Sequence, residues 1–293
     1  MARMAVVGTM AWDEPVRLTA PLTRGGRIIA AAPGGRLGGG GANAAVALRR
    51  AGHAVSIGAW ISDGPDAAHV KAAAAAAGLD LTNVREIRAA AATTMILIEP
   101  DGERTILFIR KEGAAIVLPD TPPEPFDAIP WDGLYVRTAL PGMERLLASG
   151  NGPIIAHWPL PASIAADVLV GSRDDLGAIE NPFAAARAIA GPRLRAAIVT
   201  AGAEGAMAYF EGRSRHVPAA PAARVVDSTG AGDAYAAGLL DALTAGADVE
   251  AAMAHAALWG RDAVATEGSA PLAARPGAFA PFVTSGGDAA TPT

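Results

Sequence analysis

Residues 227–238 read DSTGAGDAYAAG, and this stretch decides how the whole chain is interpreted. Small residues and two glycines lead directly into a helical pattern, with Asp233 at the junction. Helix starts favour carboxylates as caps, so Asp233 has a plain structural explanation. The glycines before it, however, leave backbone N–H groups uncovered at a helix start, where such groups bind anions. The stretch therefore places a fixed negative charge beside a pocket for a negatively charged ligand.

Phosphoryl transfer to an alcohol explains both features. The reaction needs donors that neutralise the spreading charge and a group that accepts the proton of the attacking nucleophile. The backbone N–H groups of Gly230, Ala231 and Gly232 are such donors and need no lysine. Asp233 can take the proton from a hydroxyl. The local sequence thus predicts an anion hole with a catalytic base at its edge.

Composition bounds the class of protein. The chain has 293 residues, of which 51% are hydrophobic and 18% charged, which suits one large α/β domain with a small accessory piece. A net charge of −5 without a basic stripe argues against a nucleic-acid partner. No cysteine is present, so disulfides and thiolate metal sites are excluded. No run approaches the ~20 apolar residues of a membrane span, and we expect a cytoplasmic protein without a membrane partner.

Short apolar segments alternate with helical patterns along most of the chain. Strands are expected at 4–8, 27–32, 55–60, 133–137, 153–158, 166–171 and 196–202. Helices are expected from Asn43, at 71–77, at 182–190 and at 234–265 with an interruption near Gly246. Hairpins are expected around the turn at 100–102 and around His216. This order predicts an α/β fold with a doubly wound, mostly parallel sheet, helices on both faces and a small β lid.

A second glycine-rich stretch, GGGGANAAVALRRAG at residues 38–52, is ambiguous alone. It fits a flexible loop, and it fits the dinucleotide spacing Gly39-x-Gly41-x-x-Ala44 with Asp63 further on. That motif needs a strand running directly into the first glycine, and residues 33–36 (PGGR) interrupt such a strand. A phosphate loop of the Gly-Lys-Ser/Thr kind is excluded, because the chain contains no such tripeptide.

Together the two stretches resemble the C-terminal and N-terminal signatures of the ribokinase-like sugar kinases, the PfkB carbohydrate kinase family. The segment TAGAEG at 200–205 is similar to the family's T-x-G-x-x-G segment. The segment DGERTILFIRKEGAA at 101–115 looks like one found in fructokinases and ketodeoxygluconate kinases. The resemblance covers nearly the whole chain. It implies one ribokinase-like domain over 1–283, with lid segments at about 9–33 and 88–111 and a flexible tail at 284–293.

The resemblance also implies a role for particular residues. Asp233 would be the catalytic base, beside an anion hole of Gly230, Ala231 and Gly232. The sugar would contact Asp13, Gly39, Gly40, Asn43 and Arg110. ATP would lie against Thr200, Gly202, Gly205, Thr229 and Gly268. The family's Asn-x-x-Glu segment is altered here to GSRDD at 171–175, where Ser172 replaces the asparagine. Asp175, or its neighbour Asp174, would then hold Mg²⁺ through a water.

The expected activity is ATP- and Mg²⁺-dependent phosphorylation of a hydroxyl of a small sugar or sugar acid. A nucleoside (adenosine-like) kinase and a non-catalytic sugar- or nucleotide-binding homologue remain alternatives, with a nicotinamide-dependent oxidoreductase as an outsider. A sugar phosphate would need a further basic group, for which Arg27, Arg36 and Arg104 are candidates. The sequence leaves open the exact acceptor, the need for a monovalent cation such as K⁺, and a homodimer through the lid.

Overall fold

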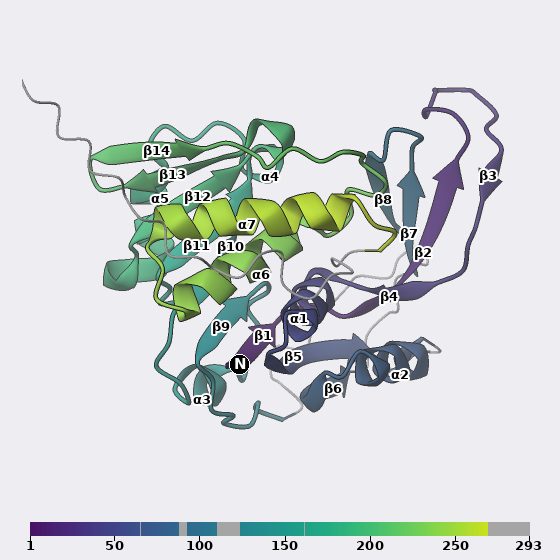
Figure 1. Ribbon diagram of the computed structural model, residues 1–293. Helices are drawn as coiled ribbons and strands as arrows, with labels where there is room; N and C mark the ends of the chain where they lie inside the picture. The colour runs from purple at the N-terminus through teal and green to yellow at the C-terminus, as the bar shows by residue number, and fades with distance from the viewer. Residues whose placement is uncertain (65, 88–92, 110–123, 161, 269–293) are drawn as a thin grey trace, which may run out of the picture.

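A nine-stranded sheet runs through the molecule, in the order β14-β13-β12-β11-β10-β9-β1-β5-β6 (Figure 1). This computed structural model describes residues 1–64, 66–87, 93–109, 124–160 and 162–268. The strands are β1 (Arg3–Val7), β5 (Ala54–Ser62), β6 (Asp80–Ile87), β9 (Gly133–Val136), β10 (Ile154–Trp158), β11 (Val168–Ser172), β12 (Ala196–Thr200), β13 (Ala206–Phe210) and β14 (Arg213–Val217). Only the pairs β12–β13 and β13–β14 are antiparallel. The predicted mostly parallel, doubly wound sheet is confirmed.

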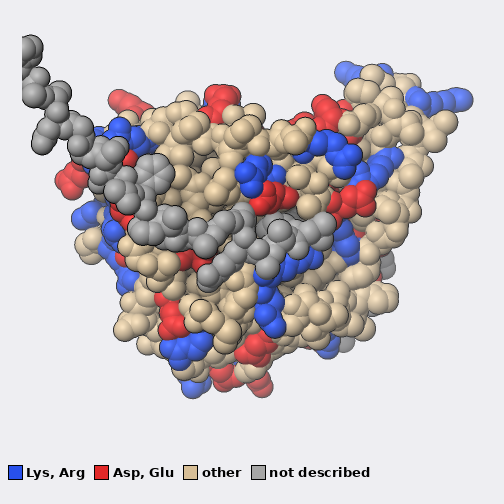
Figure 2. All heavy atoms as spheres, in the orientation of Figure 1, with Lys and Arg blue, Asp and Glu red and all other residues tan. Residues whose placement is uncertain are grey.

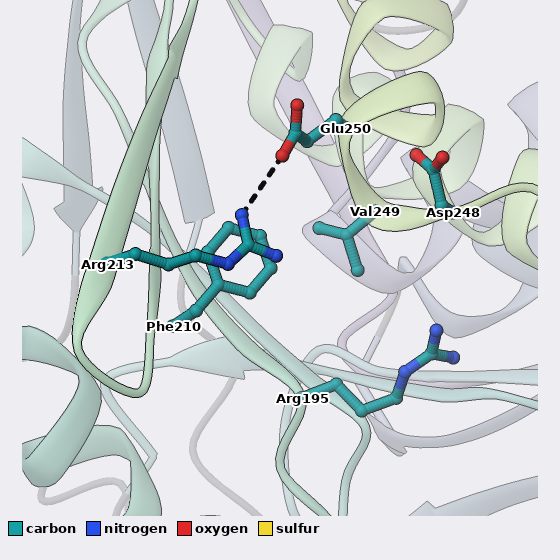
Figure 3. Close-up of a pocket in the computed structure, with 6 residues that line it drawn as sticks. All are labelled: Arg195, Phe210, Arg213, Asp248, Val249 and Glu250. Carbon is teal, nitrogen blue, oxygen red and sulfur yellow. Dashed lines mark hydrogen bonds and ion pairs between the residues drawn. The ribbon is translucent and has the colours of Figure 1, made fainter.

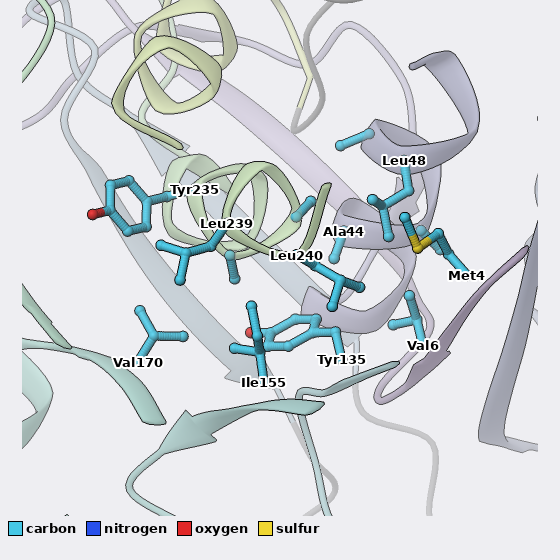
Figure 4. Close-up of a cluster of buried hydrophobic side chains, with 14 of the residues drawn as sticks. Met4, Val6, Ala44, Leu48, Tyr135, Ile155, Val170, Tyr235, Leu239 and Leu240 are labelled. Carbon is cyan, nitrogen blue, oxygen red and sulfur yellow. The ribbon is translucent and has the colours of Figure 1, made fainter. Parts of the chain in front are cut away.

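Alternation along each buried strand divides the core between the two faces of this sheet. In β1, Met4 and Val6 belong to one buried cluster, whereas Ala5 and Val7 belong to the other. The first cluster (Figure 4) packs under α1 (Gly40–Arg50), α2 (Ala67–Ala76), α6 (Ala231–Thr244) and α7 (Val249–Val264). The second packs against α3 (Glu144–Leu147) and α5 (Pro182–Ala190). Both faces are therefore covered, as a parallel sheet requires.

The sheet has a topological switch point at β1. Strands β5 and β6 follow β1 in sequence and lie on one side of it, whereas β9 to β12 extend the sheet on the other side. Where strand order reverses in this way, the loops at the carboxyl ends of the strands leave a crevice in which ligands bind. Gly8 after β1 and Arg137 after β9 lie at this edge.

A second, five-stranded sheet lies beside the first (Figure 1). It contains β2 (Ala11–Leu18), β3 (Ala30–Ala31), β4 (Arg36–Gly38), β7 (Thr93–Ile98) and β8 (Arg104–Ile109). The hairpin predicted around 100–102 is formed by β7 and β8. The strand predicted at 27–32 is wrong in extent, because only the two residues of β3 pair with β2. The predicted tail at 284–293 lies outside the described residues.

The smaller sheet contacts the loop that precedes α6. The N–H of Ser228 donates to the carbonyl of Gly102 at 3.0 Å, and Nη1 of Arg104 donates to Oγ of Ser228 at 3.0 Å. A second link joins Arg17 on β2 to Glu267, with 3.1 Å between nitrogen and oxygen. The turn of the hairpin is thereby fixed next to the residues that lead into the predicted anion hole.

Two further observations concern the molecule as a whole. Basic and acidic side chains are interspersed over the face drawn in Figure 2. None of the described helices is long and apolar enough to cross a bilayer.

Two short 3₁₀ segments, η1 (Gly191–Arg193) and η2 (Gly202–Glu204), and one short helix, α4 (Arg173–Leu176), complete the described elements.

A buried polar contact joins three elements behind α6. Asp241 on α6 pairs through its two carboxylate oxygens with Nε2 of His53 and Nε2 of His255, each at 2.8 Å. Nδ1 of His53 accepts the N–H of Ala2 at 3.3 Å, so Nε2 is the nitrogen that donates to the carboxylate. These contacts hold the pKa of Asp241 well below its usual range, although burial opposes the shift.

We expect Asp241→Ala to lower the free energy of unfolding by about 2–3 kcal/mol, because two buried imidazoles lose their acceptor. Thermal unfolding followed by circular dichroism measures the change. Asp262→Ala is the matched control, since the partner of Asp262 among the described residues is its neighbour Arg261, at a partly exposed position. A melting temperature unchanged by Asp241→Ala would contradict this account of the contact.

Candidate active site

The first turn of α6 exposes backbone donors. Gly230 precedes the helix with φ of 75°, a left-handed conformation that glycine adopts without strain. Within the described part of the chain, the N–H groups of Gly230 and Gly232 have no acceptor, whereas the N–H of Ala231 donates to the carbonyl of Ser228 at 3.3 Å. Two of the three predicted donors are thus unpaired at a helix start, where an anion binds favourably.

Asp233 does not cap its own helix. Its Oδ2 accepts from Nδ2 of Asn43 at 3.0 Å, and its Oδ1 accepts from Nε of Arg137 at 3.0 Å. The Asp233 side chain is 13% exposed, so part of it remains accessible to solvent. Three segments that are far apart in sequence, α1, the end of β9 and the start of α6, therefore meet at this carboxylate.

Because the four glycines at 38–41 have no side chains, their backbone can pass close to the residues around Asp233. A Cβ on Gly40 would lie 2.6 Å from Nε of Arg137 and 2.8 Å from Oδ1 of Asp233. A Cβ on Gly38 would lie 1.7 Å from Oδ2 of Asp13. Gly39, with φ of 86°, joins β4 to α1 between them. A side chain at Gly38 would displace Asp13, and one at Gly40 would displace Asp233 and Arg137.

Asp13 is the second buried carboxylate of the crevice. It lies on β2 and is 4% exposed, with a hydrogen bond from the backbone of Gly39. Burial raises the pKa of Asp13 to about 6, and the negative charges of Asp227 and Asp233 add to the shift, while Arg36 opposes it. An ionised Asp13 can accept hydrogen bonds from the hydroxyls of an acceptor molecule.

The raised pKa makes Asp13 a source of instability at neutral pH. Its pKa is about 6 in the fold against an ordinary 3.8, so protonated Asp13 favours folding below about pH 4 and this contribution disappears as the pH rises through 6. At about 1.4 kcal/mol per pKa unit, ionisation costs roughly 3 kcal/mol. We expect Asp13→Asn to stabilise the protein by up to that amount at pH 8 but not at pH 4.

Unfolding by urea at the two pH values measures the effect of Asp13→Asn. Asp80→Asn is the matched control, because hydrogen bonds from Thr82 and Ser56 hold the pKa of Asp80 low despite its partial burial. If Asp13→Asn raised the free energy of unfolding equally at both pH values, the ionisation of Asp13 would not be the cause.

Arg137 was not identified from the sequence. It follows β9 directly and pairs with Asp233, and its charge acts on its neighbours. The pKa of His157 on β10 falls to about 3, first because of burial and then because of Arg137, so His157 stays neutral. Burial raises the pKa of Tyr135 far above its usual range. The available signal was the position of Arg137 at the carboxyl end of an apolar strand, where ligand-binding residues gather.

The residues predicted to border ATP lie at the ends of neighbouring elements. Thr200 is the last residue of β12, and its Oγ1 donates to the carbonyl of Gly171 at 3.2 Å. Gly202 and Gly205 follow with φ of 53° and 95°. The loop is tied to α4, since Nη1 of Arg173 donates to Glu204 at 2.8 Å. Gly268 lies beyond the end of α7, and Thr229 lies one residue before Gly230.

The predicted metal position carries two adjacent exposed carboxylates, Asp174 and Asp175. Asp175 lies in α4, which Ser172 caps by accepting the N–H of Asp174 at 3.2 Å, and its charge acts on Arg137. The described residues contain no cluster of three His, Asp or Glu side chains suited to a metal. Mg²⁺ commonly takes one carboxylate, waters and substrate phosphates, so this residue fits that ion once a nucleotide is bound. Arg110 lies outside the described residues.

A separate hollow lies near the amino end of β12 in the large sheet, at the edge opposite to Asp233 (Figure 3). It has a volume of about 420 Å³ and is lined by Arg195, Phe210, Arg213, Asp248, Val249 and Glu250. Arg195 precedes β12, so this hollow is at the amino edge of the sheet, away from Asp233. Arg213 is already engaged, since it pairs with Glu250 at 3.1 Å and lies 3.8 Å from the centre of the Phe210 ring. The residues that gather around Asp233, and not this hollow, are therefore the candidate active site.

Several solved structures of similar fold are kinases. A microbiome-derived acarbose kinase aligns with a TM-score of 0.70 at 20% identity and covers 91% of this chain and 93% of its own. A ribokinase from Thermotoga maritima aligns with a TM-score of 0.65 at 20% identity, over 92% of this chain and 96% of its own. At these identities the likeness establishes the ribokinase-like fold, and a carboxylate beside unpaired helix-start amides suits phosphoryl transfer to an alcohol.

The pfkB family carbohydrate kinase model matches residues 1–142 and 161–274, so the chain belongs to this family of kinases. A fructokinase from Klebsiella pneumoniae is 29% identical over 242 residues, which are 71% of this chain and 77% of that protein. A nucleoside kinase from Methanocaldococcus jannaschii is 43% identical over 58 residues, which are only 20% of this chain and 19% of that protein. The family expected from the two glycine-rich stretches is confirmed.

Proposed function

We propose that the protein transfers the terminal phosphoryl group of ATP to a hydroxyl of a small sugar or sugar acid. One observation carries the proposal. The Asp233 carboxylate is held by Asn43 and Arg137 at 3.0 Å each, at the start of a helix whose amides at Gly230 and Gly232 have no acceptor among the described residues. In this proposal the carboxylate is the base, and the neighbouring amides form the anion hole.

In this proposal Asp233 takes the proton of the attacking hydroxyl as the bond to phosphorus forms. Asn43 and Arg137 keep the carboxylate pointed at that hydroxyl, and the free amides stabilise the charge that develops on the phosphoryl oxygens. Asp13, Gly39, Gly40, Asn43 and Arg110 orient the acceptor, and Thr200, Gly202, Gly205, Thr229 and Gly268 border the nucleotide. Mg²⁺, held by Asp175 through a water, would supply positive charge to the phosphates.

A sugar acceptor is better supported than a nucleoside. The fructokinase match extends over 71% of this chain, whereas the nucleoside kinase match covers 20%. A ribokinase of Cryptococcus neoformans, similar in fold at 24% identity, was solved in complex with ADP, which supports an adenine nucleotide as donor. The nucleoside kinase stays as the second candidate because its short match reaches 43% identity.

The experiment is a coupled assay of ADP release with ATP and Mg²⁺ against a panel of hexoses, pentoses, 2-keto sugar acids and nucleosides. Turnover with a sugar or sugar acid at least tenfold above that with any nucleoside supports the proposal. Faster turnover with adenosine supports the second candidate. Nucleotide binding without turnover of any acceptor would show a non-catalytic homologue.

We also propose that the smaller sheet is a lid and a dimer surface. Its edge strand β8 exposes apolar side chains, including Phe108 at 66% and Ile109 at 47%, and an edge of this kind invites pairing with a second copy. Equilibrium sedimentation tests the dimer, and a monomer at every concentration would refute it. Because the nucleotide donor is cytoplasmic, we propose that the enzyme acts in the cytoplasm.

A further inference from the structure

Asp227, the first residue of the DSTGAGD stretch, is completely buried, with 0% exposure. Its Oδ1 accepts the N–H of Thr229 at 2.9 Å, and its Oδ2 accepts Nη2 of Arg36 at 2.8 Å. A buried carboxylate is costly unless a positive charge or several donors compensate it. Arg36, on β4 of the smaller sheet, is the charged partner of this carboxylate.

Arg36 acts on two carboxylates. Besides its ion pair with Asp227, its charge lowers the pKa of Asp13, against the effects of burial and of the charges on Asp227 and Asp233. The Arg36 side chain is 20% exposed, and its buried Nε has no acceptor among the described residues. The guanidinium therefore lies between the acceptor side of the crevice and the loop that forms the anion hole.

The position of Asp227 makes this compensation matter for phosphate binding. Asp227 is separated from Gly230 only by Ser228 and Thr229, so its charge lies close to the amides that would receive the phosphates. Without Arg36, a buried negative charge would repel the nucleotide at the donors intended for it. Neutralising Asp227 is thus a condition for a working anion hole.

A bound monovalent cation could in principle supply the same positive charge, but the residues do not fit one at Asp227. Such a cation needs several oxygen ligands, and one lone pair on each oxygen of Asp227 is already taken by a hydrogen bond, from Thr229 on Oδ1 and from Arg36 on Oδ2. The guanidinium would also repel a second cation at that position. These contacts indicate that the positive charge next to Asp227 comes from the guanidinium of Arg36 and not from a bound ion.

Resting on the proposed kinase function, we propose that Arg36 is a positioning residue that serves as a built-in cation for the anion hole. It neutralises Asp227 from the smaller sheet, so nucleotide binding and turnover are independent of K⁺. The same contact couples the smaller sheet to the nucleotide loop.

The test measures the affinity for a nonhydrolysable ATP analogue by calorimetry, in potassium chloride and in tetramethylammonium chloride at equal ionic strength. The wild-type protein should bind equally in both salts. Arg36→Gln should bind about tenfold more weakly in the tetramethylammonium salt and recover in potassium chloride. The double variant Arg36→Gln/Asp227→Asn should bind nearly as the wild type does in either salt, because it has no buried charge to compensate.

Arg104→Gln is the matched control, since Arg104 lies in the same sheet and contacts the same loop through the neutral Oγ of Ser228. It should show no dependence on K⁺. Wild-type binding that requires K⁺, or an Arg36→Gln protein that binds as tightly as the wild type in both salts, would overturn the inference. If Arg36→Gln does not fold, folding of the double variant supports neutralisation of Asp227 by Arg36, and wild-type binding that requires K⁺ still overturns the inference.

The binding measurement needs no acceptor and no turnover. A protein that binds the analogue equally in both salts but phosphorylates nothing in the acceptor panel would refute the proposed function and leave the role of Arg36 in place. A protein that phosphorylates a sugar only in K⁺ would refute the role of Arg36 and leave the proposed function in place.

Discussion

Asp233→Asn should reduce turnover by about a thousandfold, with little change in the affinity for ATP. Proton acceptance by a positioned carboxylate contributes about 10²–10⁴-fold to such reactions, and asparagine cannot accept the proton. The asparagine oxygen can still accept from Arg137, so the variant should fold normally and keep the shape of the crevice. Steady-state kinetics on the best acceptor of the panel gives kcat, and calorimetry with a nonhydrolysable ATP analogue gives nucleotide affinity.

Asp248→Asn is the control for this experiment, because Asp248 is an ordinary helix cap. It precedes α7, and its Oδ1 accepts the N–H of Ala251 at 2.8 Å. If Asp233 were only another helix-start carboxylate, the two variants would behave alike, with a small loss of stability and normal turnover. Wild-type kcat in Asp233→Asn would therefore remove Asp233 from the reaction and return it to a structural role.

Arg137→Gln should lower kcat by about a hundredfold while changing the acceptor KM much less. The Nε of Arg137 fixes Oδ1 of Asp233 at 3.0 Å, and the described residues provide no acceptor for its terminal nitrogens. Those nitrogens are free to stabilise the charge that grows on the phosphoryl oxygens, a contribution commonly of about 10²–10³-fold when one such donor is removed. The split between kcat and KM follows because the interaction strengthens in the transition state.

Arg137→Lys refines this experiment. A lysine keeps the positive charge but has no planar fork of donors, so it cannot hold Asp233 and a phosphate oxygen in the same geometry. We expect it to recover only part of the lost kcat. Arg195→Gln is the matched control, because Arg195 is an exposed arginine at the amino edge of the sheet. An Arg137→Gln enzyme with normal kcat would show that the ion pair is merely structural.

The part of the site that is continuous in sequence could be predicted, and the part assembled by pairing could not. DSTGAGD contains the proposed base and the proposed donor amides within a single turn, so both roles could be proposed from local spacing. Arg137 follows an unremarkable apolar strand, and its partnership with Asp233 exists only because β9 lies next to β1 at the switch point. Arg36 and Arg104 were candidate basic groups of the ligand site, but the sequence alone could not place them. In the structure they lie on the smaller sheet, where Arg36 contacts Asp227 and Arg104 contacts Ser228.

For the fold as well, strands with a clear local sequence pattern could be predicted, whereas strands held by long-range pairing could not. Mostly buried strands such as β10 and β11 consist largely of apolar residues and were predicted close to their observed places. The edge strand β6 was missed because its sequence DLTNVREI is polar and half exposed, without a continuous apolar run. The extent of β2 was missed as well, since its AWDEPVRL pattern contains Pro15 and is held by parallel pairing with β7, far along the chain.

The pairing of β2 with β7 also constrains when the protein acquires its ligand site. Residues 13–17 must find residues 94–98, and β5, α2 and β6 lie between these two segments in the chain. Closing so long a loop is slow compared with forming neighbouring strands and helices. The pairing of β1 with β9 in the large sheet joins segments that are still further apart in sequence. During refolding, nucleotide and acceptor binding should therefore recover together with the burial of the core tryptophans, because both sheets depend on closing a long loop.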